Sequence, residues 1–477
     1  MDTRKTSIRI LMFPWLAHGH ISPVLELAKR LANRNFFIYV CSSPINLDSI
    51  RTKLSEKESI SIKLVELHIP ASPELPPNYH TTNGLPHNLM PALKKALDTA
   101  RPSFSNTLKT LKPDLVLYDY LHPWAPEEAM LQNIPAVLFF TTCAAACAYI
   151  LHEVLKPGTE FPFPFPFYGD IEYKRHSGMY SNETNDSDRV MNCVQRSSDI
   201  ILIKTFRELE GKYIDYCSVL SQKKFVPVGP LVQAPVSTGD DHSEIIEWLD
   251  GKTPNSTVFA SFGSEYFLSE EDIEEIAYGL ELSGVNFIWA VRFPIDKHIK
   301  IEEKLPKGFL DRVAERGIVV DWAPQARILA HSSVGGFMSH CGWSSVLESI
   351  HFGVPVVALP MHLDQPLNAR LVAEMGLGEE VVRKQEENLE REEVVRVIRK
   401  VVVEKEGENL RRKAKELSEK MRGKGEEEID GVVEEMVKLC NREEKLNLSP
   451  ANSMKKLDLM MTNREDVMEN AWKHEAK

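Results

Sequence analysis

The chain has 477 residues, of which 57 are Lys or Arg and 69 are Asp or Glu, giving a formal net charge of −12. At about 100–200 residues per domain, this length predicts two or three domains that can each bury a full core. The acidic balance argues against nucleic acid or an anionic membrane surface as the main partner. Seven scattered cysteines without a CxxC pair predict neither a disulfide framework nor a structural zinc site, which favours a reducing, cytoplasmic location.

Short apolar runs alternate with helical patterns along the first half of the chain. Between the first two runs, apolar residues recur at helical spacing from Ile21, with Ser22 expected as the N-cap and Pro23 at the first helical position. The uncharged stretch 129–151 contains Pro135, so we interpret it as a buried strand followed by a helix and not as a membrane span. The expected strands are 8–13, 36–41, 62–67, 114–118, 136–140 and 199–203.

The second half repeats this alternation after a Pro- and Gly-rich segment, 226–241, that is typical of a linker. Apolar runs separated by helices indicate parallel sheets covered on both faces. We therefore expect an α/β protein with two doubly wound, Rossmann-like domains facing each other across a cleft. The expected strands are 257–262, 286–291, 317–322, 335–338 and 355–360, and two charged helices are expected at 408–422 and 426–442. The expected divisions are 1–235, 236–430, and a closing helix with a disordered tail, 431–477.

Ligands of doubly wound sheets bind beyond the carboxyl ends of the strands, so polar residues there are the first candidates for chemistry. His20 follows the first strand, and an imidazole is a suitable general base near neutral pH. Asp119 directly follows another apolar strand, where it could orient His20 and stabilise its cation. From position alone, His20 could equally be a surface histidine beside a helix, Asp119 could be a loop or capping residue, and His18 is a competing base.

A second candidate site is the glycine-rich segment 335–345, in which a strand passes into a helix expected at 344–351. Small residues at a helix start leave backbone N–H groups and the positive dipole end open to a diphosphate. His340 could donate to a phosphate oxygen, and the turn at Ser264 offers similar N–H groups. An ordinary strand-to-helix turn is the alternative. No Rossmann glycine fingerprint, Walker motif, H-E-x-x-H zinc motif or G-x-S-x-G elbow occurs, and no metal site is predicted.

The segment 322–365, WAPQARILAHSSVGGFMSHCGWSSVLESIHFGVPVVALPMHLDQ, resembles the 44-residue signature box of plant UDP-dependent glycosyltransferases that modify small secondary metabolites. The beginning of the chain and the strand ending at Asp119 are also similar to this family, and the resemblance covers roughly residues 8–442. It implies the two-domain GT-B fold.

The resemblance also implies roles for individual residues, with His20 as the catalytic base and Asp119 as its partner. Trp322 would stack on uracil, the Ala323 backbone would pair with the uracil edge, and Gln325 and Glu348 would lie at the ribose. The implied diphosphate contacts are His340, Ser345 and Ser264, and the implied sugar contacts are Trp343, Asp364 and Gln365. Gly342 and Ser344 complete the expected donor-binding set.

The sequence departs from the family pattern at two of these places. The family usually has Asn where this chain has Ser344, which puts one phosphate contact in doubt. Many relatives have Gly where this chain has Asp321, which could shift the loop before Trp322.

Within the family, the segments 80–86, 118–126 and 206–216 resemble the branch whose members add a sugar to a sugar already present on a glycoside. The resemblance implies an inverting, UDP-glucose-dependent enzyme that forms a β-glucosidic bond, with UDP-glucose as co-substrate and no other cofactor or metal. Direct glucosylation of an aglycone hydroxyl, another UDP-sugar, a non-catalytic nucleotide-sugar binder and a nicotinamide-dependent oxidoreductase are the alternatives. The acceptor, a terpenoid or flavonoid glycoside, would lie near Trp15, Thr142 and the loop 155–190. A monomer is expected.

Overall fold

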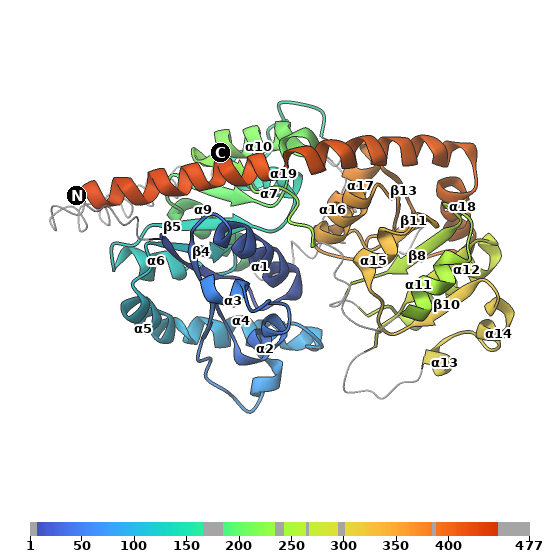
Figure 1. Ribbon diagram of the computed structural model, residues 1–477, viewed down its shortest axis with the longest axis horizontal. Helices are drawn as coiled ribbons and strands as arrows, with labels where there is room; N and C mark the ends of the chain where they lie inside the picture. Colours follow the sequence, from blue (N-terminus) through green and yellow to red (C-terminus); the bar gives the residue numbers. More distant parts are fainter. Residues whose placement is uncertain are drawn as a thin grey trace.

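The computed structural model describes residues 7–165, 185–233, 243–263, 267–293, 301–383 and 388–446. These residues form two parallel sheets, each covered by helices on both sides (Figure 1). The strands of the first sheet run from blue to green in Figure 1 and those of the second from green to orange, so the strands of each sheet come from one half of the chain. This is the doubly wound arrangement predicted from the alternating apolar runs.

The first sheet has the strand order β3-β2-β1-β4-β5-β6-β7, and every neighbouring pair is parallel. The strands are β1 (Arg9–Phe13), β2 (Phe37–Ser42), β3 (Ile62–Glu66), β4 (Leu115–Asp119), β5 (Ala136–Phe140), β6 (Ile200–Ile203) and β7 (Lys224–Pro227). The first six were predicted. Strand β7 was not predicted, because it is short and contains Pro227; it lies at the edge of the sheet, where a proline is tolerated.

The second sheet has the order β10-β9-β8-β11-β12-β13, again parallel throughout. The strands are β8 (Thr257–Ser261), β9 (Asn286–Ala290), β10 (Gly317–Val320), β11 (Val334–Ser339), β12 (Val356–Ala358) and β13 (Gly378–Glu380). Strand β13, with the sequence Gly-Glu-Glu, lacks the apolar pattern from which the other five were predicted.

Helices and single turns connect the strands. In the first half they are α1 (His18–Ala32), α2 (Pro44–Arg51), α3 (Glu58–Ser61), η1 (Pro77–Tyr79), η2 (His87–Leu89), α4 (Met90–Thr99), α5 (Arg101–Leu111), α6 (Ala125–Met130), α7 (Ala144–Leu155), α9 (Asn185–Arg196) and α10 (Arg207–Ser221). In the second half they are α11 (Ser243–Asp250), α12 (Glu270–Ser283), α13 (Ile301–Lys304), α14 (Phe309–Val313), α15 (Gln325–Leu329), α16 (Trp343–Phe352), α17 (Gln365–Glu374), α18 (Arg391–Val402) and α19 (Lys405–Leu446). The stretch 129–151 contains β5 and most of α7, as predicted, and none of the described helices is long and apolar enough to cross a membrane.

Helix α1 begins five residues earlier than predicted. Its N-cap is Ala17, whose carbonyl accepts the N–H groups of His20 and Ile21 at 3.0 and 2.9 Å. The expected N-cap, Ser22, therefore lies inside the helix, where its hydroxyl accepts a hydrogen bond from Gln233. Ala17 gives no side-chain signal of a helix start, so the Ser-Pro pair was the stronger but misleading cue.

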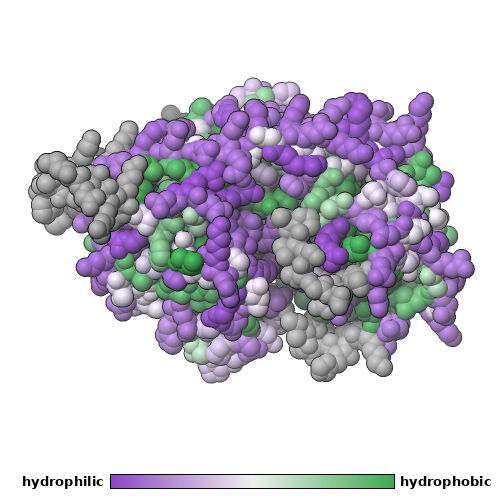
Figure 2. Space-filling model, in the orientation of Figure 1, coloured by the Kyte–Doolittle hydropathy of each residue, from purple (hydrophilic) through white to green (hydrophobic). Residues whose placement is uncertain are grey.

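The two helices expected at 408–422 and 426–442 are one continuous helix, α19, which lies across both halves of the molecule (Figure 1). Its residues Ile429, Val432 and Met436 are buried in the core cluster formed by one face of the first sheet. Figure 2 shows that the outward side of this helix is hydrophilic. The expected division at 430/431 falls within α19, while the expected division at 235/236 and the tail 447–477 lie outside the described residues.

Candidate active site

The predicted catalytic residues come together at the carboxyl edge of the first sheet. Strands β1, β4, β5 and β6 are consecutive neighbours there, so the segments that follow them lie side by side. The first turn of α1 places His20 at this edge, and Asp119 is the last residue of β4. The next two strands contribute Thr141 and Lys204 directly after their ends.

His20 and Asp119 form a hydrogen-bonded pair, with 2.7 Å between His20 Nδ1 and Asp119 Oδ2. The Asp119 side chain is 1% exposed and the His20 side chain is 16% exposed, so the carboxylate is held behind the ring. The second carboxylate oxygen accepts the backbone N–H of Leu121 at 3.1 Å, and Thr141 Oγ1 lies 3.3 Å from His20 Nδ1. With Nδ1 engaged by Asp119, a role as general base would fall to the other ring nitrogen, Nε2.

The charge state of Asp119 suits this arrangement. Burial alone would raise the pKa of its carboxyl, but the charge of His20 and the hydrogen bond with it, together with His122 and the Leu121 N–H, lower that pKa below its ordinary value. Asp119 is therefore a carboxylate at neutral pH and can stabilise an imidazolium.

The competing base, His18, has a different environment. Its Nε2 lies 3.1 Å from the ammonium of Lys53. Desolvation and the positive charges of Lys53, Arg292 and Lys204 lower the pKa of His18 to about 4. No carboxylate among the described residues forms an ion pair with this ring, which makes His18 a poorer base than His20.

On the second sheet, the turn from β11 into α16 forms the expected small-residue helix start. Gly342 is the N-cap of α16, and Cys341 before it adopts a positive φ of 63°. A Cβ at Gly263 or Gly342 would lie 2.8 or 2.5 Å from His340 Nε2, so both glycines are needed for the close approach of the ring. Burial and the nearby His362 lower the pKa of His340 to about 4, so the ring is neutral at pH 7.

The residues expected at the nucleoside lie near one another. Gln325 Nε2 donates to Glu348 Oε2 at 2.6 Å, which joins the start of α15 to α16. Burial raises the pKa of Glu348, and Gln325 and Lys204 partly offset that rise. Trp322 is 47% exposed, which is uncommon for a side chain of this size. Ala323 follows it, and its carbonyl accepts the Gln325 N–H at 2.9 Å.

The residues expected at the sugar form a link between the two halves. The Thr142 hydroxyl donates to Asp364 Oδ2 at 2.5 Å, and Asn368 Nδ2 donates to the same oxygen at 3.2 Å. Gln365 is buried, and its Oε1 accepts the N–H groups of Met361 and His362, both at 3.0 Å. A residue predicted on the acceptor side, Thr142, thus touches one predicted on the donor side.

Trp343 and Ser344 also face the first half of the chain. The buried indole of Trp343 donates through Nε1 to the Lys204 carbonyl at 2.5 Å, and Lys204 Nζ donates to Ser344 Oγ at 2.7 Å. The Trp343 side chain is therefore engaged within the protein. Lys204 was not among the predicted site residues, although it directly follows the apolar run 199–203, the same signal that singled out Asp119.

The remaining predicted positions are less informative. Trp15 is buried, with its ring 5.9 Å from that of His122 in an aromatic cluster. Ser264 and residues 166–184 of the expected acceptor loop lie outside the described residues. Ser345 lies in the first turn of α16.

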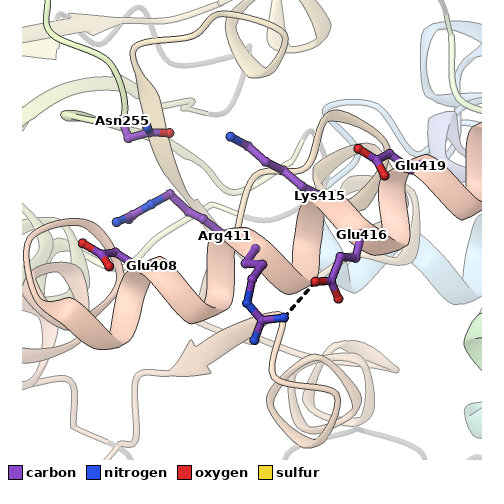
Figure 3. Close-up of a pocket in the computed structure, with 7 residues that line it drawn as sticks. Asn255, Glu408, Arg411, Lys415, Glu416 and Glu419 are labelled. Carbon is purple, nitrogen blue, oxygen red and sulfur yellow. Dashed lines mark hydrogen bonds and ion pairs between the residues drawn. The ribbon is translucent and has the colours of Figure 1, made fainter.

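A surface hollow elsewhere contains none of these residues. It lies on α19 beside Asn255 and is lined by charged side chains, among them Arg412 and Glu416, which form an ion pair at 2.8 Å (Figure 3). Groups of three or more His, Cys, Asp or Glu placed to hold a metal ion do not occur among the described residues.

Comparison with known proteins gives the family. A model described as "Glycosyltransferase, N-terminal domain" matches residues 6–233, and one described as "UDP-glucoronosyl and UDP-glucosyl transferase" matches residues 231–419. UDP-glucosyltransferase 29 of Panax ginseng is 57% identical over 447 residues, which cover 93% of this chain and 99% of that protein. The chain belongs to the UDP-glycosyltransferase family.

Two further relatives are named for reactions on glycosides. The beta-D-glucosyl crocetin beta-1,6-glucosyltransferase of Gardenia jasminoides is 52% identical, covering 90% of this chain and 98% of its own. The cyanidin-3-O-glucoside 2-O-glucuronosyltransferase of Bellis perennis is 48% identical, covering 92% and 99%.

Solved structures show the same architecture. Glycyrrhiza uralensis UGT73P12, complexed with glycyrrhetinic acid 3-O-monoglucuronide, matches with a TM-score of 0.82 at 23% identity, covering 94% of this chain and 100% of that one. Phytolacca americana UGT2, complexed with UDP-2-fluoro-glucose and pterostilbene, matches with a TM-score of 0.73 at 25% identity, covering 90% and 100%. The predicted GT-B fold is confirmed, and the chain is a UDP-glycosyltransferase that uses a UDP-sugar, not a nicotinamide-dependent oxidoreductase.

Proposed function

We propose that this UDP-glycosyltransferase is an inverting enzyme that transfers glucose from UDP-glucose to a sugar hydroxyl of a small terpenoid or flavonoid glycoside. The observation that carries the catalytic part is the 2.7 Å contact between His20 and the buried Asp119 at the carboxyl edge of the first sheet. The names of two relatives, 52% and 48% identical, support a glycoside as acceptor. The names of two relatives, 57% and 52% identical, support glucose as the donor sugar.

The proposed reaction is a single displacement. His20 Nε2 takes the proton of the acceptor hydroxyl while that oxygen forms a bond to the anomeric carbon of α-linked UDP-glucose. The bond from this carbon to the β-phosphate oxygen breaks, and UDP leaves with the electron pair, so the product is β-linked. Asp119 holds the ring in the required tautomer and stabilises the imidazolium.

The proposed donor site is the start of α16 and the segments around it. Free N–H groups and the dipole of this ten-residue helix suit a diphosphate, and neutral His340 can add one N–H donor. Half-exposed Trp322 suits stacking on uracil, and the Gln325–Glu348 pair suits the ribose hydroxyls. Asp364, Gln365 and the Trp343 backbone are proposed to contact the glucose.

Location and assembly are also part of the proposal. All seven cysteines are free, which suits a reducing compartment such as the cytoplasm. We propose a monomer, because one chain supplies the elements that cover both sheets, with α19 covering part of the first.

The experiment that tests this function is an acceptor screen with UDP-glucose that compares aglycones with their monoglucosides. Release of UDP is followed by determination of the linkage in the product. We expect monoglucosides to react at least about 10-fold better in kcat/KM, because a site with hydrogen-bond partners for a sugar disfavours acceptors that lack one. Equal or better activity on bare aglycones would overturn the branch-forming part, and UDP binding without any transfer would favour a non-catalytic nucleotide-sugar binder.

A further inference from the structure

Lys204 is a buried cation that the mechanism above does not use. It directly follows β6 in the acceptor-side half of the chain, and the residue is 2% exposed. Its ammonium donates to Ser344 Oγ at 2.7 Å, and its carbonyl accepts the Trp343 indole N–H at 2.5 Å. The two contacts fix Lys204 against the first turn of α16, across the junction between the halves.

This is an unfavourable place for a positive charge that has no anion beside it. A helix N-terminus carries roughly half a positive charge, so an ammonium there is repelled. Among the described residues, no carboxylate lies within ion-pair distance of Lys204; Glu348 and Glu26 stabilise its charge from further away. An ammonium has three N–H donors, and Ser344 accepts one of them.

The charge nevertheless persists at neutral pH. Burial lowers the pKa of Lys204 to about 8, and the two glutamates limit that fall. His340, which precedes the same helix start, is neutral because its pKa is about 4. The positive potential around the first turn of α16 is therefore increased by Lys204 and not by His340.

We propose that Lys204 binds the diphosphate of the UDP-sugar, so that the acceptor-side domain supplies a cation to the donor site and Ser344 holds that cation in place. This rests on the proposed function, because it assigns the diphosphate to the start of α16. Lys204 would neutralise the charge that develops on UDP as the bond to the anomeric carbon breaks. Binding the donor through both halves of the chain would also couple donor binding to the closure of the site.

The test compares UDP with uridine, which shares the nucleoside but lacks the phosphates. Binding of each is measured by calorimetry on the full chain, for wild type and for Lys204→Met. A hydrogen bond between charged groups contributes about 1.5–3 kcal/mol, so we expect UDP to bind about 10- to 100-fold more weakly to the variant and uridine to stay within about twofold.

Lys223→Met is the matched control. Lys223 is a partly buried lysine of the same domain whose ammonium donates to the Ser197 carbonyl at 2.6 Å. Among the described residues it forms no hydrogen bond or ion pair with α16, so its loss should leave the ratio of UDP to uridine affinity unchanged. Ser344→Ala keeps the cation but removes its hydrogen-bond partner, so it should weaken UDP binding by a smaller factor than Lys204→Met does.

A pH series provides a second readout. Wild-type affinity for UDP should fall as the pH rises through about 8, because Lys204 loses its proton there, and this fall should be absent in Lys204→Met. Glu348, Glu26 and His18 are the other titratable groups whose charges interact with Lys204, and burial raises the pKa of both glutamates. The His18 ring, whose pKa is about 4, is already neutral in this range, and the Lys204→Met series separates the lysine from the two acids. Uridine in the same buffers corrects for titration of the base.

The binding results distinguish a lysine that contacts the diphosphate from one that does not. Equal weakening of UDP and uridine would show that Lys204 only holds the domains together, and unchanged binding of both would show that it does not face the donor; either result overturns the inference. Wild type that binds UDP but transfers nothing to glycosides would overturn the proposed function, while the comparison of UDP with uridine would still decide the role of Lys204.

Discussion

Two histidines in the first turn of α1 differ in what lies against their rings. His18 Nε2 faces the Lys53 ammonium, whereas His20 Nδ1 faces the Asp119 carboxylate, which is itself held by a backbone N–H. A cation beside an imidazole disfavours its protonated form, and a carboxylate favours it. A spacing of two residues therefore separates a poor general base from a good one.

We expect His20→Ala to lower kcat by about 10²- to 10⁴-fold, the range for loss of a positioned base, with UDP affinity within a few-fold of wild type. His18→Ala is the matched control, because it removes a ring from the same turn without touching Asp119. Steady-state kinetics and UDP binding by calorimetry measure both effects. If His18→Ala lost as much activity as His20→Ala, the assignment of the base would be wrong.

At the scale of elements, the start of α7 depends on a residue from another helix. Glu210 of α10 is buried, and its two carboxylate oxygens accept the N–H groups of Ala144 and Ala145 at 2.9 and 2.8 Å. Cys143, the N-cap of α7, accepts the Ala146 N–H through its sulfur at 3.1 Å. The adjacent Thr142 contacts Asp364, so this cap also positions a predicted part of the sugar site.

We expect Glu210→Ala to lower the free energy of unfolding by about 2–3 kcal/mol, because it leaves two buried N–H groups without acceptors. Asp215→Ala on the same helix, whose side chain is 63% exposed in an ion pair with Arg207, should change it by less than about 1 kcal/mol. Denaturant unfolding measures both, and equal effects would contradict the capping role.

The same carboxyl gives that stability a pH dependence with a defined sign. Burial raises the pKa of Glu210 from its ordinary value of 4.5 to about 7. The hydrogen bonds that it accepts from backbone N–H groups lower this pKa but do not cancel the effect of burial. Between these values the folded protein holds a proton that the unfolded chain has released, so this group makes stability fall as pH rises. The Ala variant should lose this contribution.

Most strands and the two proposed catalytic residues could be predicted from the sequence alone, whereas other features could not. Long apolar runs predicted eleven strands because central parallel strands are buried on both faces, whereas the short edge strands β7 and β13 have no such pattern. His20 and Asp119 could be found by their position after strands. Glu210 could not, because it caps a helix that begins 66 residues earlier in the chain.

At the scale of the whole molecule, α19 follows the second domain in the sequence but completes the core of the first domain. Ile429, Val432 and Met436 are fully buried against the first sheet, while Arg34, in the turn after α1, pairs with Glu426 and Asp430 at 2.7 and 2.6 Å. The two acidic side chains are 69% and 65% exposed, so these ion pairs add little, and the apolar contacts carry most of the attachment. The core of the first half of the chain is therefore incomplete without residues near the end of the sequence.

Because α19 packs on the first sheet, a core substitution in this helix should mainly affect the stability of that sheet. Ile429→Ala should lower the free energy of unfolding by about 2–4 kcal/mol, because it removes a buried side chain and leaves a cavity. Backbone amides of β1, β4 and β6 should then exchange hydrogen faster, since their sheet loses part of its cover, while those of β8 and β11 should change less. Glu434→Ala, at a side chain that is 72% exposed on the same helix, should change stability by no more than about 0.5 kcal/mol. Faster exchange confined to the second sheet would show that α19 is held by that half alone, and the two halves would then not share this helix as a common part of their cores.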